Sequence, residues 1–319
     1  MKKLFVGVLC VALSLSVQGK EVNMTSPDGK YQFTLSDSGG QLHYSLTWNG
    51  KQTVKPSLLG INANVEWRDG VEIGTVDSSR KDTIWHPVYG ERSEIKDCYH
   101  AWKIVVNRQN GRDKLILDVR AYDEGIAFRY HFPGGQYLKI TDEYTEYTMP
   151  EGTKAYFTPK AQTPYSYLPL ENWPGESDRP LLLTLADGGY VCLAEAQVVD
   201  YVRTKFNVSP TKKNTIISAM YGPVEDIAPY STPWRVIMCA DNPGEILEHN
   251  DILLNLNPPC RIKDTSWIKP GKVMREVTLT TEGGKALVDF AVKRNLQYIH
   301  FDAGWYGFCL LYTSDAADD

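Results

Sequence analysis

Apolar and polar residues alternate in short segments from Glu21 to about Met238, and Gly, Pro, Asn and Asp separate these segments. Alternation with a period of two predicts strands, because successive side chains of a strand point to opposite faces of a sheet. Hairpin connections are predicted at Ser26-Pro-Asp-Gly29, Trp48-Asn-Gly50, Gln109-Asn-Gly111 and Ala186-Asp-Gly-Gly189. We therefore expect a large antiparallel sandwich of two sheets, with strands at residues 31–35, 42–48, 102–107, 114–122, 126–132, 181–184, 190–194 and 215–220.

The pattern changes after Asn242-Pro-Gly244. Residues 245–253 predict a short helix, and residues 257–264 form a Pro-rich connector of the kind that separates domains. A strand is then predicted at 265–269, a helix at 283–294 and a buried strand at 296–301. Strand, helix and strand make one βαβ unit, and its second strand ends at Asp302.

The N-terminus predicts a secretory signal peptide over residues 1–19. Lys2 and Lys3 precede an apolar run at 4–17, and the small residue Gly19 follows it. A membrane anchor is the alternative, but the run is shorter than the roughly 20 residues that a spanning helix needs. We therefore expect an exported, periplasmic protein with no stable membrane insertion once the signal is removed.

The composition is that of a globular protein rich in aromatic residues, with 42% hydrophobic residues, 19 Tyr and 8 Trp among 319 residues. Amphipathic rings suit stacking on sugar faces, but they also serve β-rich cores, so both interpretations stay open. The net charge of −5 is small, and Lys2-Lys3 at the N-terminus does not extend into a longer run of Lys or Arg. The other Lys and Arg neighbours in the sequence are also no more than pairs, so nucleic acid is not an expected partner. None of these features determines the oligomeric state.

Cys98, Cys192, Cys239 and Cys260 have no CxxC or Cys/His spacing that would suggest zinc. An exported protein permits a disulfide such as Cys239 with Cys260, but buried free thiols are the preferred interpretation. His86, His100 and His131 are scattered and are expected to be structural residues. Arg129 and Arg235 lie beside strand aromatics and are expected to pair with acids such as Asp123 or Glu124.

Five pieces of sequence follow one another in a distinctive order: Trp85-His-Pro-Val-Tyr-Gly-Glu91, Arg120-Ala-Tyr-Asp-Glu-Gly-Ile-Ala-Phe-Arg-Tyr130, Thr232-Pro-Trp-Arg235, Asp264-Thr-Ser-Trp-Ile-Lys-Pro-Gly271 and Asp302-Ala-Gly-Trp-Tyr306. Together they resemble glycoside hydrolase family 97, exported bacterial enzymes that act on α-glucosides or α-galactosides, with an oligo- or polysaccharide as substrate. The resemblance implies a galactose-mutarotase-like β-sandwich at residues 20–256. Over residues 257–308 it implies a linker and the start of a catalytic (β/α)8 barrel. It also implies calcium at the active site.

Residues 309–319 depart from this family and look like a translated sequencing adapter, with a natural acidic terminus as the alternative. Glycoside hydrolysis needs two carboxyl groups that flank the scissile bond. The resemblance implies that these come from later barrel strands, beyond residue 308. We therefore assign no catalytic residue, and we expect the 319-residue chain to be inactive by itself. Sugar preference and stereochemical outcome depend on the same residues.

Glu195 is the candidate metal ligand, because it follows an apolar strand where a core-facing pattern would not place a carboxylate. The resemblance implies a Glu in this region that ligates calcium, which barrel carboxylates would complete. An ordinary exposed strand Glu is the alternative. Glu171 and Trp173 lie in an aromatic loop and are candidate substrate contacts, although the prolines of this loop also suit a stiff interdomain connection.

Asp302 is a further candidate substrate contact, because functional groups of a (β/α)8 barrel sit at the C-terminal ends of its strands. The alternative is an Asp that caps the loop after the strand. Trp267 and Lys269 are likewise candidate substrate contacts, because they lie near the end of the first predicted strand of the βαβ unit.

The leading hypothesis is a calcium-dependent exo-acting α-glycosidase of the family 97 type, comprising its sandwich and the first βαβ unit of its barrel. The alternative is a non-enzymatic carbohydrate-binding sandwich. A mutarotase-like sandwich enzyme ranks third, because it rests on fold analogy alone.

Overall fold

A computed structural model describes residues 19–108, 111 and 113–305 of the chain. The predicted signal peptide, apart from Gly19, and the predicted adapter tail lie outside the described residues. The chain divides into two units, one made of residues up to Trp85 together with Glu94–Pro259, the other of His86–Ser93 and the residues from Cys260 onward. In the part of the chain that is described, no helix has the length and apolar character to cross a bilayer.

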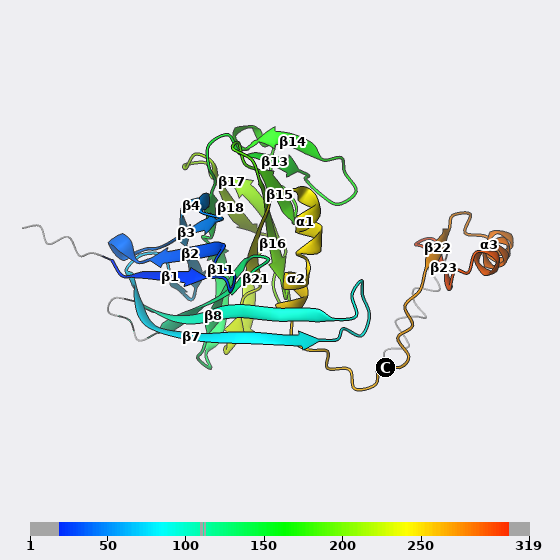
Figure 1. Cartoon of the computed structure of the whole chain (residues 1–319), viewed down its shortest axis with the longest axis horizontal. Coiled ribbons are helices and arrows are strands. Elements are labelled where there is room, and N and C mark those ends of the chain that lie inside the picture. Colours follow the sequence, from blue (N-terminus) through cyan, green and yellow to red (C-terminus); the bar gives the residue numbers. More distant parts are fainter. Residues whose placement is uncertain (1–18, 109–110, 112, 306–319) are drawn as a thin grey trace, which may run out of the picture. The chain divides into compact units, whose positions relative to one another are not determined.

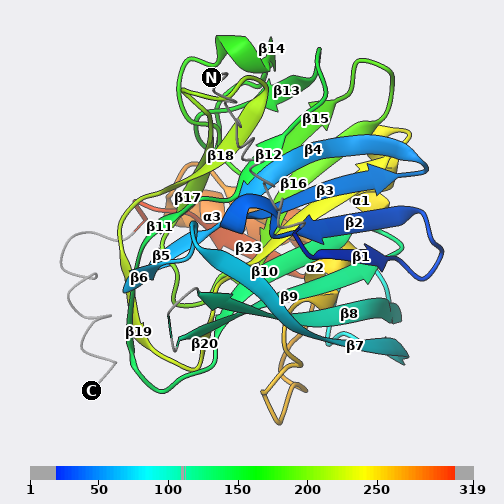
Figure 2. The same ribbon diagram turned by 90° about the vertical axis from the view of Figure 1, so that its left-hand side faces the viewer.

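Two large antiparallel sheets build the first unit, and they face one another across a common core (Figures 1 and 2). The seven-stranded sheet has the order β1 (Glu21–Thr25), β2 (Tyr31–Ser36), β3 (Leu42–Trp48), β4 (Lys51–Leu59), β12 (Glu146–Thr148), β18 (Thr215–Met220) and β17 (Thr204–Val208). A smaller four-stranded sheet has the order β19 (Val224–Ile227), β11 (Tyr137–Glu143), β5 (Ile61–Ala63) and β6 (Val65–Glu66).

The ten-stranded sheet carries the residues discussed below. Its order is β14 (Ser166–Pro169), β13 (Lys154–Phe157), β15 (Leu181–Thr184), β16 (Tyr190–Ala196), β21 (Trp234–Ala240), β10 (Ile126–Phe132), β9 (Lys114–Tyr122), β8 (Ile95–Arg108) and β7 (Val71–Trp85), with β20 (Tyr230–Ser231) paired to β10. Together the sheets confirm the prediction of a mainly β, antiparallel sandwich.

Alternation located strands well where one sheet face is more polar than the other. The predicted ranges 42–48, 114–122, 126–132, 181–184 and 215–220 coincide with β3, β9, β10, β15 and β18. Strand β21 had no such signal, because every one of its residues is buried and both of its faces are covered. Strand β7 was also missed, since most of its residues are exposed and polar.

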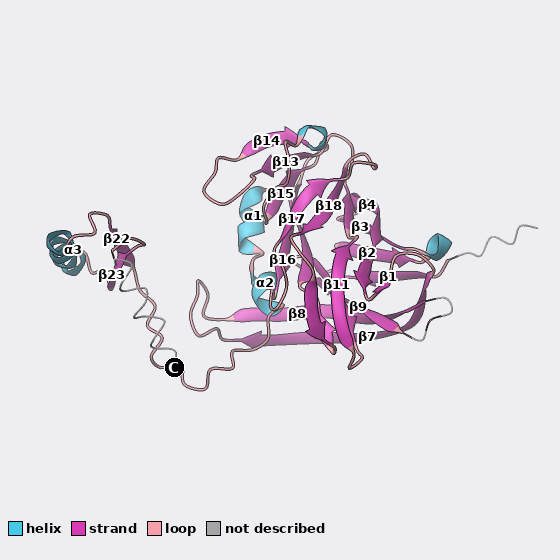
Figure 3. Ribbon diagram, turned by 180° about the vertical axis from the view of Figure 1, so that it is seen from behind, coloured by secondary structure: helices cyan, strands magenta, loops and turns pink. Residues whose placement is uncertain are grey.

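Apolar side chains are buried on both faces of the ten-stranded sheet. On β16, Val191 and Leu193 belong to the core between the sheets, whereas Cys192 and Ala194 belong to a second core on the outer face. Helices α1 (Pro243–Glu248) and α2 (Asp251–Asn255) cover part of that outer face (Figure 3). The sequence predicted one helix at 245–253. The chain instead forms two, and the second begins at an Asp, a residue that favours helix N-termini.

The second unit contains β22 (Val273–Glu276), α3 (Thr281–Lys293) and β23 (Tyr298–Phe301), and its two strands pair in parallel. One βαβ unit is therefore present, as predicted, but its second strand is exposed or half-buried rather than buried as expected. The strand predicted at 265–269 is wrong, because these residues form a turn. The side chain of Asp264 accepts a hydrogen bond from the backbone N–H of Ser266 at 2.9 Å, and the N–H of Ile268 donates to the carbonyl of Thr265 at 3.1 Å. These local bonds occupy donors that a strand would need.

The cysteines of the described residues are free thiols, as the sequence suggested, but the expectation that they are buried is correct only for Cys192 and Cys239. Cys192 and Cys239 are buried, Cys98 is half-buried and Cys260 is exposed.

Gly125 joins β9 to β10 where the backbone of β21 passes closely. A Cβ atom at this position would lie 2.7 Å from the carbonyl oxygen of Ile237, a backbone atom that cannot move away easily. We expect Gly125→Ala to destabilise the fold by about 1–3 kcal/mol, measured as a lower midpoint of thermal unfolding by circular dichroism. Gly222→Ala is the matched control, because its Cβ would meet nothing within 4 Å. Equal midpoints for the two variants would contradict this packing argument.

Candidate functional site

Glu195, the predicted metal ligand, lies on the inner face of the ten-stranded sheet. It continues the row of Val191 and Leu193 along β16 and stands directly opposite Arg235 of β21. Residues two apart on a strand share a face, so both charged side chains point into the sandwich. Its side chain is 20% exposed, whereas that of Arg235 is 1% exposed.

Four charged side chains, Glu143, Arg179, Glu195 and Arg235, form a buried ion cluster. Arg235 donates from Nε to Oε1 of Glu143 at 2.8 Å and from Nη2 to Oε2 of the same carboxylate. Its Nη1 donates to Oε2 of Glu195 at 2.7 Å, and Nε of Arg179 lies 3.6 Å from that oxygen. The cluster balances two positive and two negative groups, as buried charges require.

The pKa values in the cluster follow from burial and pairing. Burial by itself raises the pKa of Glu143, but the ion pair with Arg235 outweighs it and holds this pKa below the ordinary value. Burial lowers the pKa of Arg179, and the positive charge of Arg235 adds to that effect. Burial also raises the pKa of Tyr201 well above its usual range, and the nearby Glu143 carboxylate acts in the same direction. Glu143 therefore stays charged and Tyr201 stays protonated at neutral pH.

Calcium takes six to eight oxygen ligands. Oε2 of Glu195 already accepts hydrogen bonds from Arg235 and, at 3.2 Å, from the hydroxyl of Thr204, and two guanidinium groups lie beside it. Within the described ranges, no three His, Cys, Asp or Glu side chains are grouped so as to hold a metal ion. These residues by themselves do not fit a calcium site.

The predicted substrate contacts Glu171 and Trp173 lie in and next to a single 3-10 turn, Leu170–Asn172. Glu171 is exposed. The indole of Trp173 packs against Phe157 with ring centroids 5.4 Å apart, and it contacts the core between the sheets. The two side chains therefore have different environments, and their role in sugar binding stays a prediction.

The remaining predicted contacts belong to the second unit. Asp302 follows β23, accepts a hydrogen bond from the backbone N–H of Ala303 at 2.8 Å and pairs with Arg275 of β22 at 3.1 Å. The hydrogen bond and the positive charge hold the pKa of Asp302 below its ordinary value. Trp267 and Lys269 are exposed and precede β22, so their predicted place on a strand is wrong.

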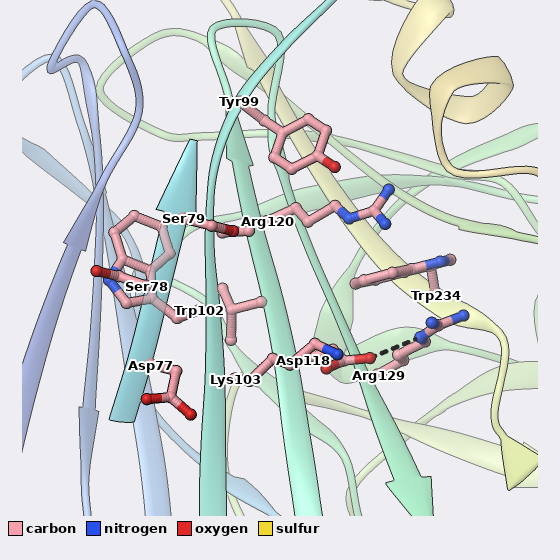
Figure 4. A pocket seen from close by; sticks show the side chains of 12 residues that line it. Asp77, Ser78, Ser79, Tyr99, Trp102, Lys103, Asp118, Arg120, Arg129 and Trp234 are labelled. Atoms are coloured by element: carbon pink, nitrogen blue, oxygen red, sulfur yellow. Dashed lines mark hydrogen bonds and ion pairs between the residues drawn. The ribbon is translucent and has the colours of Figure 1, made fainter. Parts of the chain in front are cut away.

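Sequence reasoning missed a groove on the outer face of the ten-stranded sheet, of about 340 Å³, which Arg120, Arg129, Asp118 and Trp234 line (Figure 4). Arg129 pairs with Asp118 at 3.1 Å, rather than with Asp123 or Glu124 as predicted. Register explains the difference, because residues 129 and 118 stand opposite each other on β10 and β9. The sequence offered one signal for this groove. Arg120 lies on a predicted alternating strand, and the residues on both sides of it are buried.

The three histidines that the sequence predicted to be structural each contact a protein oxygen. One ring nitrogen of each lies at hydrogen-bond distance from a protein oxygen: His86 from the carbonyl of Ser93 at 3.0 Å, His100 from that of Thr25 at 2.9 Å, and His131 from the hydroxyl of Ser231 at 2.9 Å.

A family model described as glycosyl-hydrolase 97 N-terminal matches residues 24–259. The chain is 26% identical to a retaining α-galactosidase of Bacteroides thetaiotaomicron, over 96% of this chain and 53% of that protein. It is 25% identical to a probable retaining α-galactosidase of Streptomyces bingchenggensis, over 88% of this chain and 45% of the other. The chain thus spans about half the length of the curated relatives it matches.

Solved structures give the same picture. A glycoside hydrolase family 97 enzyme of Pseudoalteromonas sp. strain K8, solved in complex with panose, superposes with a TM-score of 0.81 at 25% identity. The match covers 90% of this chain and 48% of that one.

Glu143→Gln tests the ion cluster. Because the pKa of Glu143 is lowered in the folded state, its stabilisation is complete above the unfolded value of about 4.3 and is lost as pH falls through the lowered value. The variant leaves Arg235 buried without its main partner, so we expect a loss of about 3–5 kcal/mol at pH 7. Between pH 7 and pH 3 its thermal midpoint should fall less than that of the wild type.

The control is Glu225→Gln, which removes an exposed pair with Lys139 at 2.9 Å and should leave the midpoint unchanged. A Glu143→Gln protein with the wild-type midpoint and the wild-type acid dependence would refute the assigned role of the cluster.

Proposed function

The chain belongs to the glycosyl-hydrolase 97 family, and from this premise we propose that it is the N-terminal part of an α-glycosidase that removes terminal α-galactosyl or α-glucosyl residues. The observation that carries the proposal is the match of residues 24–259 to the N-terminal domain of that family. The curated relatives are named as α-galactosidases, whereas the K8 structure contains panose. The proposal therefore keeps both α-galactosides and α-glucosides as substrates.

In this proposal the sandwich supports a catalytic domain that the βαβ unit of residues 273–301 begins. Asp302 at the end of β23, together with Trp267 and Lys269, would contact substrate at the rim, and Glu171 and Trp173 would do so from the sandwich. The two carboxyl groups that hydrolysis requires would follow in the chain. An oligo- or polysaccharide is the proposed partner, and the apolar N-terminal run supports export to the periplasm.

Calcium is a separate part of the proposal. Glu195 would supply one oxygen ligand, because its side chain is the most exposed of the buried ion cluster, at 20% against 6% for Arg179. Further carboxylates would have to complete the coordination, since the neighbouring guanidinium groups already balance the cluster. Arg235 would then position Glu195 by holding its Oε2 at 2.7 Å.

A carbohydrate-binding sandwich without catalysis is the second candidate, favoured by the exposed Tyr156 and Tyr167, whose rings lie 5.0 Å apart on the β13–β14 hairpin. Paired exposed rings suit stacking on a sugar face.

Activity measurements distinguish these candidates. We expect the 319-residue chain to show no turnover of aryl α-galactosides or α-glucosides, because the proposed carboxyl pair lies beyond residue 308. The chain encoded when the source DNA is followed past codon 308 should hydrolyse at least one of them. Turnover by the 319-residue chain would refute the predicted inactivity. A downstream sequence without alternating strands and helices would favour the binding module.

Glu195→Gln tests the calcium proposal when it is introduced into the longer chain that the source DNA encodes past codon 308. Removing one charged ligand should weaken calcium binding about tenfold or more, measured by titration calorimetry and by the calcium-dependent rise in the thermal midpoint. The matched control is Glu146→Gln, which also removes an ion-paired carboxylate, with 17% exposure. Unchanged calcium affinity in Glu195→Gln would exclude Glu195 as a ligand.

A further inference from the structure

The groove on the outer face of the ten-stranded sheet extends across strands β7 to β21 and lies within the first unit. Arg120 is its central residue. In register, Arg120 stands between Ala101 of β8 and Ala127 of β10, so small side chains flank it on the sheet surface. The volume of about 340 Å³ is in the range of small-molecule sites. A long cation thus emerges from a floor of small residues.

Two aromatic rings hold the guanidinium of Arg120. It lies 4.7 Å from the ring centre of Tyr99 and 4.8 Å from that of Trp234, between the two rings (Figure 4). Within the described residues its guanidinium donates one hydrogen bond, to the hydroxyl of Tyr122, and at 3.5 Å this bond is long. Stacking on both faces leaves the in-plane N–H groups as the available donors, which is the edge that binds a carboxylate in bidentate fashion.

The other arginine of the groove is already neutralised. Arg129 donates from Nε to Oδ2 of Asp118 at 3.1 Å and from Nη1 to Oε1 of Gln197 at 3.0 Å, and it stacks on Trp234 at 4.3 Å. Arg120, by contrast, makes no ion pair with an acid within the described ranges. The lining also contains the exposed Lys103 and Asp77, which stand opposite each other on β8 and β7. Arg120 is therefore the arginine of the groove whose charge has no acidic partner.

Two buried polar atoms beside Arg120 also lack partners. Oδ1 of Asp118 and Nε1 of Trp234 have no hydrogen bond within the described residues, although Asp118 is only 8% and Trp234 only 1% exposed. An unfilled carboxylate oxygen requires a donor, and an indole N–H requires an acceptor. Unpartnered buried polar groups are rare in native structures and call for an explanation, and a ligand that completes the bonding is one.

The three unfilled groups together specify a ligand. Arg120 requires an anion, Asp118 requires a hydroxyl donor, and Trp234 requires an oxygen acceptor. A bare inorganic anion offers Asp118 no hydroxyl donor, and a neutral sugar would leave Arg120 without an anionic partner. Asp118 and Arg120 are two residues apart on β9, so roughly 7 Å separates their Cα atoms, a span that a sugar ring with its substituents can bridge.

We propose that this groove binds a sugar acid, a pyranose that carries a carboxylate. Arg120 binds the carboxylate, Asp118 accepts from a ring hydroxyl, and Trp234 donates to a ring or hydroxyl oxygen. All of these residues belong to the first unit, so the site does not depend on the proposed hydrolysis.

Titration calorimetry of the 319-residue chain tests the site with methyl α-galacturonoside and, as its uncharged match, methyl α-galactoside. We expect the uronoside to bind at least about tenfold more tightly, because only it offers an anion to Arg120. Acetate and sulfate serve as simple anions and should bind as weakly as the galactoside. Undetectable uronoside binding would overturn the proposal. So would a uronoside affinity equal to that of the galactoside or to that of acetate and sulfate.

Variants locate the binding. Arg120→Gln should weaken uronoside binding about tenfold or more and leave the weak galactoside affinity unchanged. The control is Arg80→Gln, which removes an exposed arginine of β7 that does not line the groove. Ala101→Leu fills the floor and keeps every charge, so it should also abolish binding, and it decides the question if Arg120→Gln fails to fold. Wild-type affinity in a folded Arg120→Gln or Ala101→Leu protein would refute the site.

Discussion

The fold depends on one buried guanidinium, that of Arg235. It lies at the middle strand of the ten-stranded sheet with its side chain 1% exposed, where an unpaired charge would be strongly destabilising. Its donors connect Glu143, on the four-stranded sheet, with Glu195, on the neighbouring strand β16. Two sheets are therefore joined at the point where charge must be neutralised, and the orientation of Glu195 follows from that requirement.

Strand β21 serves both faces of the sheet. Arg235 points inward to the buried ion cluster, whereas Trp234, the residue before it, points outward and stacks between Arg120 and Arg129. Because β21 is buried on both sides, its position is fixed by packing, and this fixes the groups on either side. The candidate metal ligand and the groove thus share one rigid support, which is how a strand can position chemistry on two faces.

The fold agrees with family membership. It also identifies a residue to which the resemblance assigns no role. Residues 24–259 match the family as a domain. Glu195 is the residue that the resemblance singles out, and it is held by charge. Arg120 has no such assignment, yet its stacked guanidinium lies beside two unfilled buried polar atoms. An unsatisfied buried group is a stronger indication of a ligand than an exposed charge, because its cost must be offset.

The sequence by itself determined many of the strands that alternate, the helix and the second strand of the βαβ unit, and the family, because these depend on local periodicity and on neighbouring residues. It did not locate β21, whose two buried faces remove the alternation. It also predicted that Arg129 and Arg235 pair with acids, but not which ones. The partners Asp118 and Glu143 are 11 and 92 positions away in the chain. Periodicity specifies the face that a side chain occupies, whereas strand order and register decide its neighbours, and only the tertiary structure contains these.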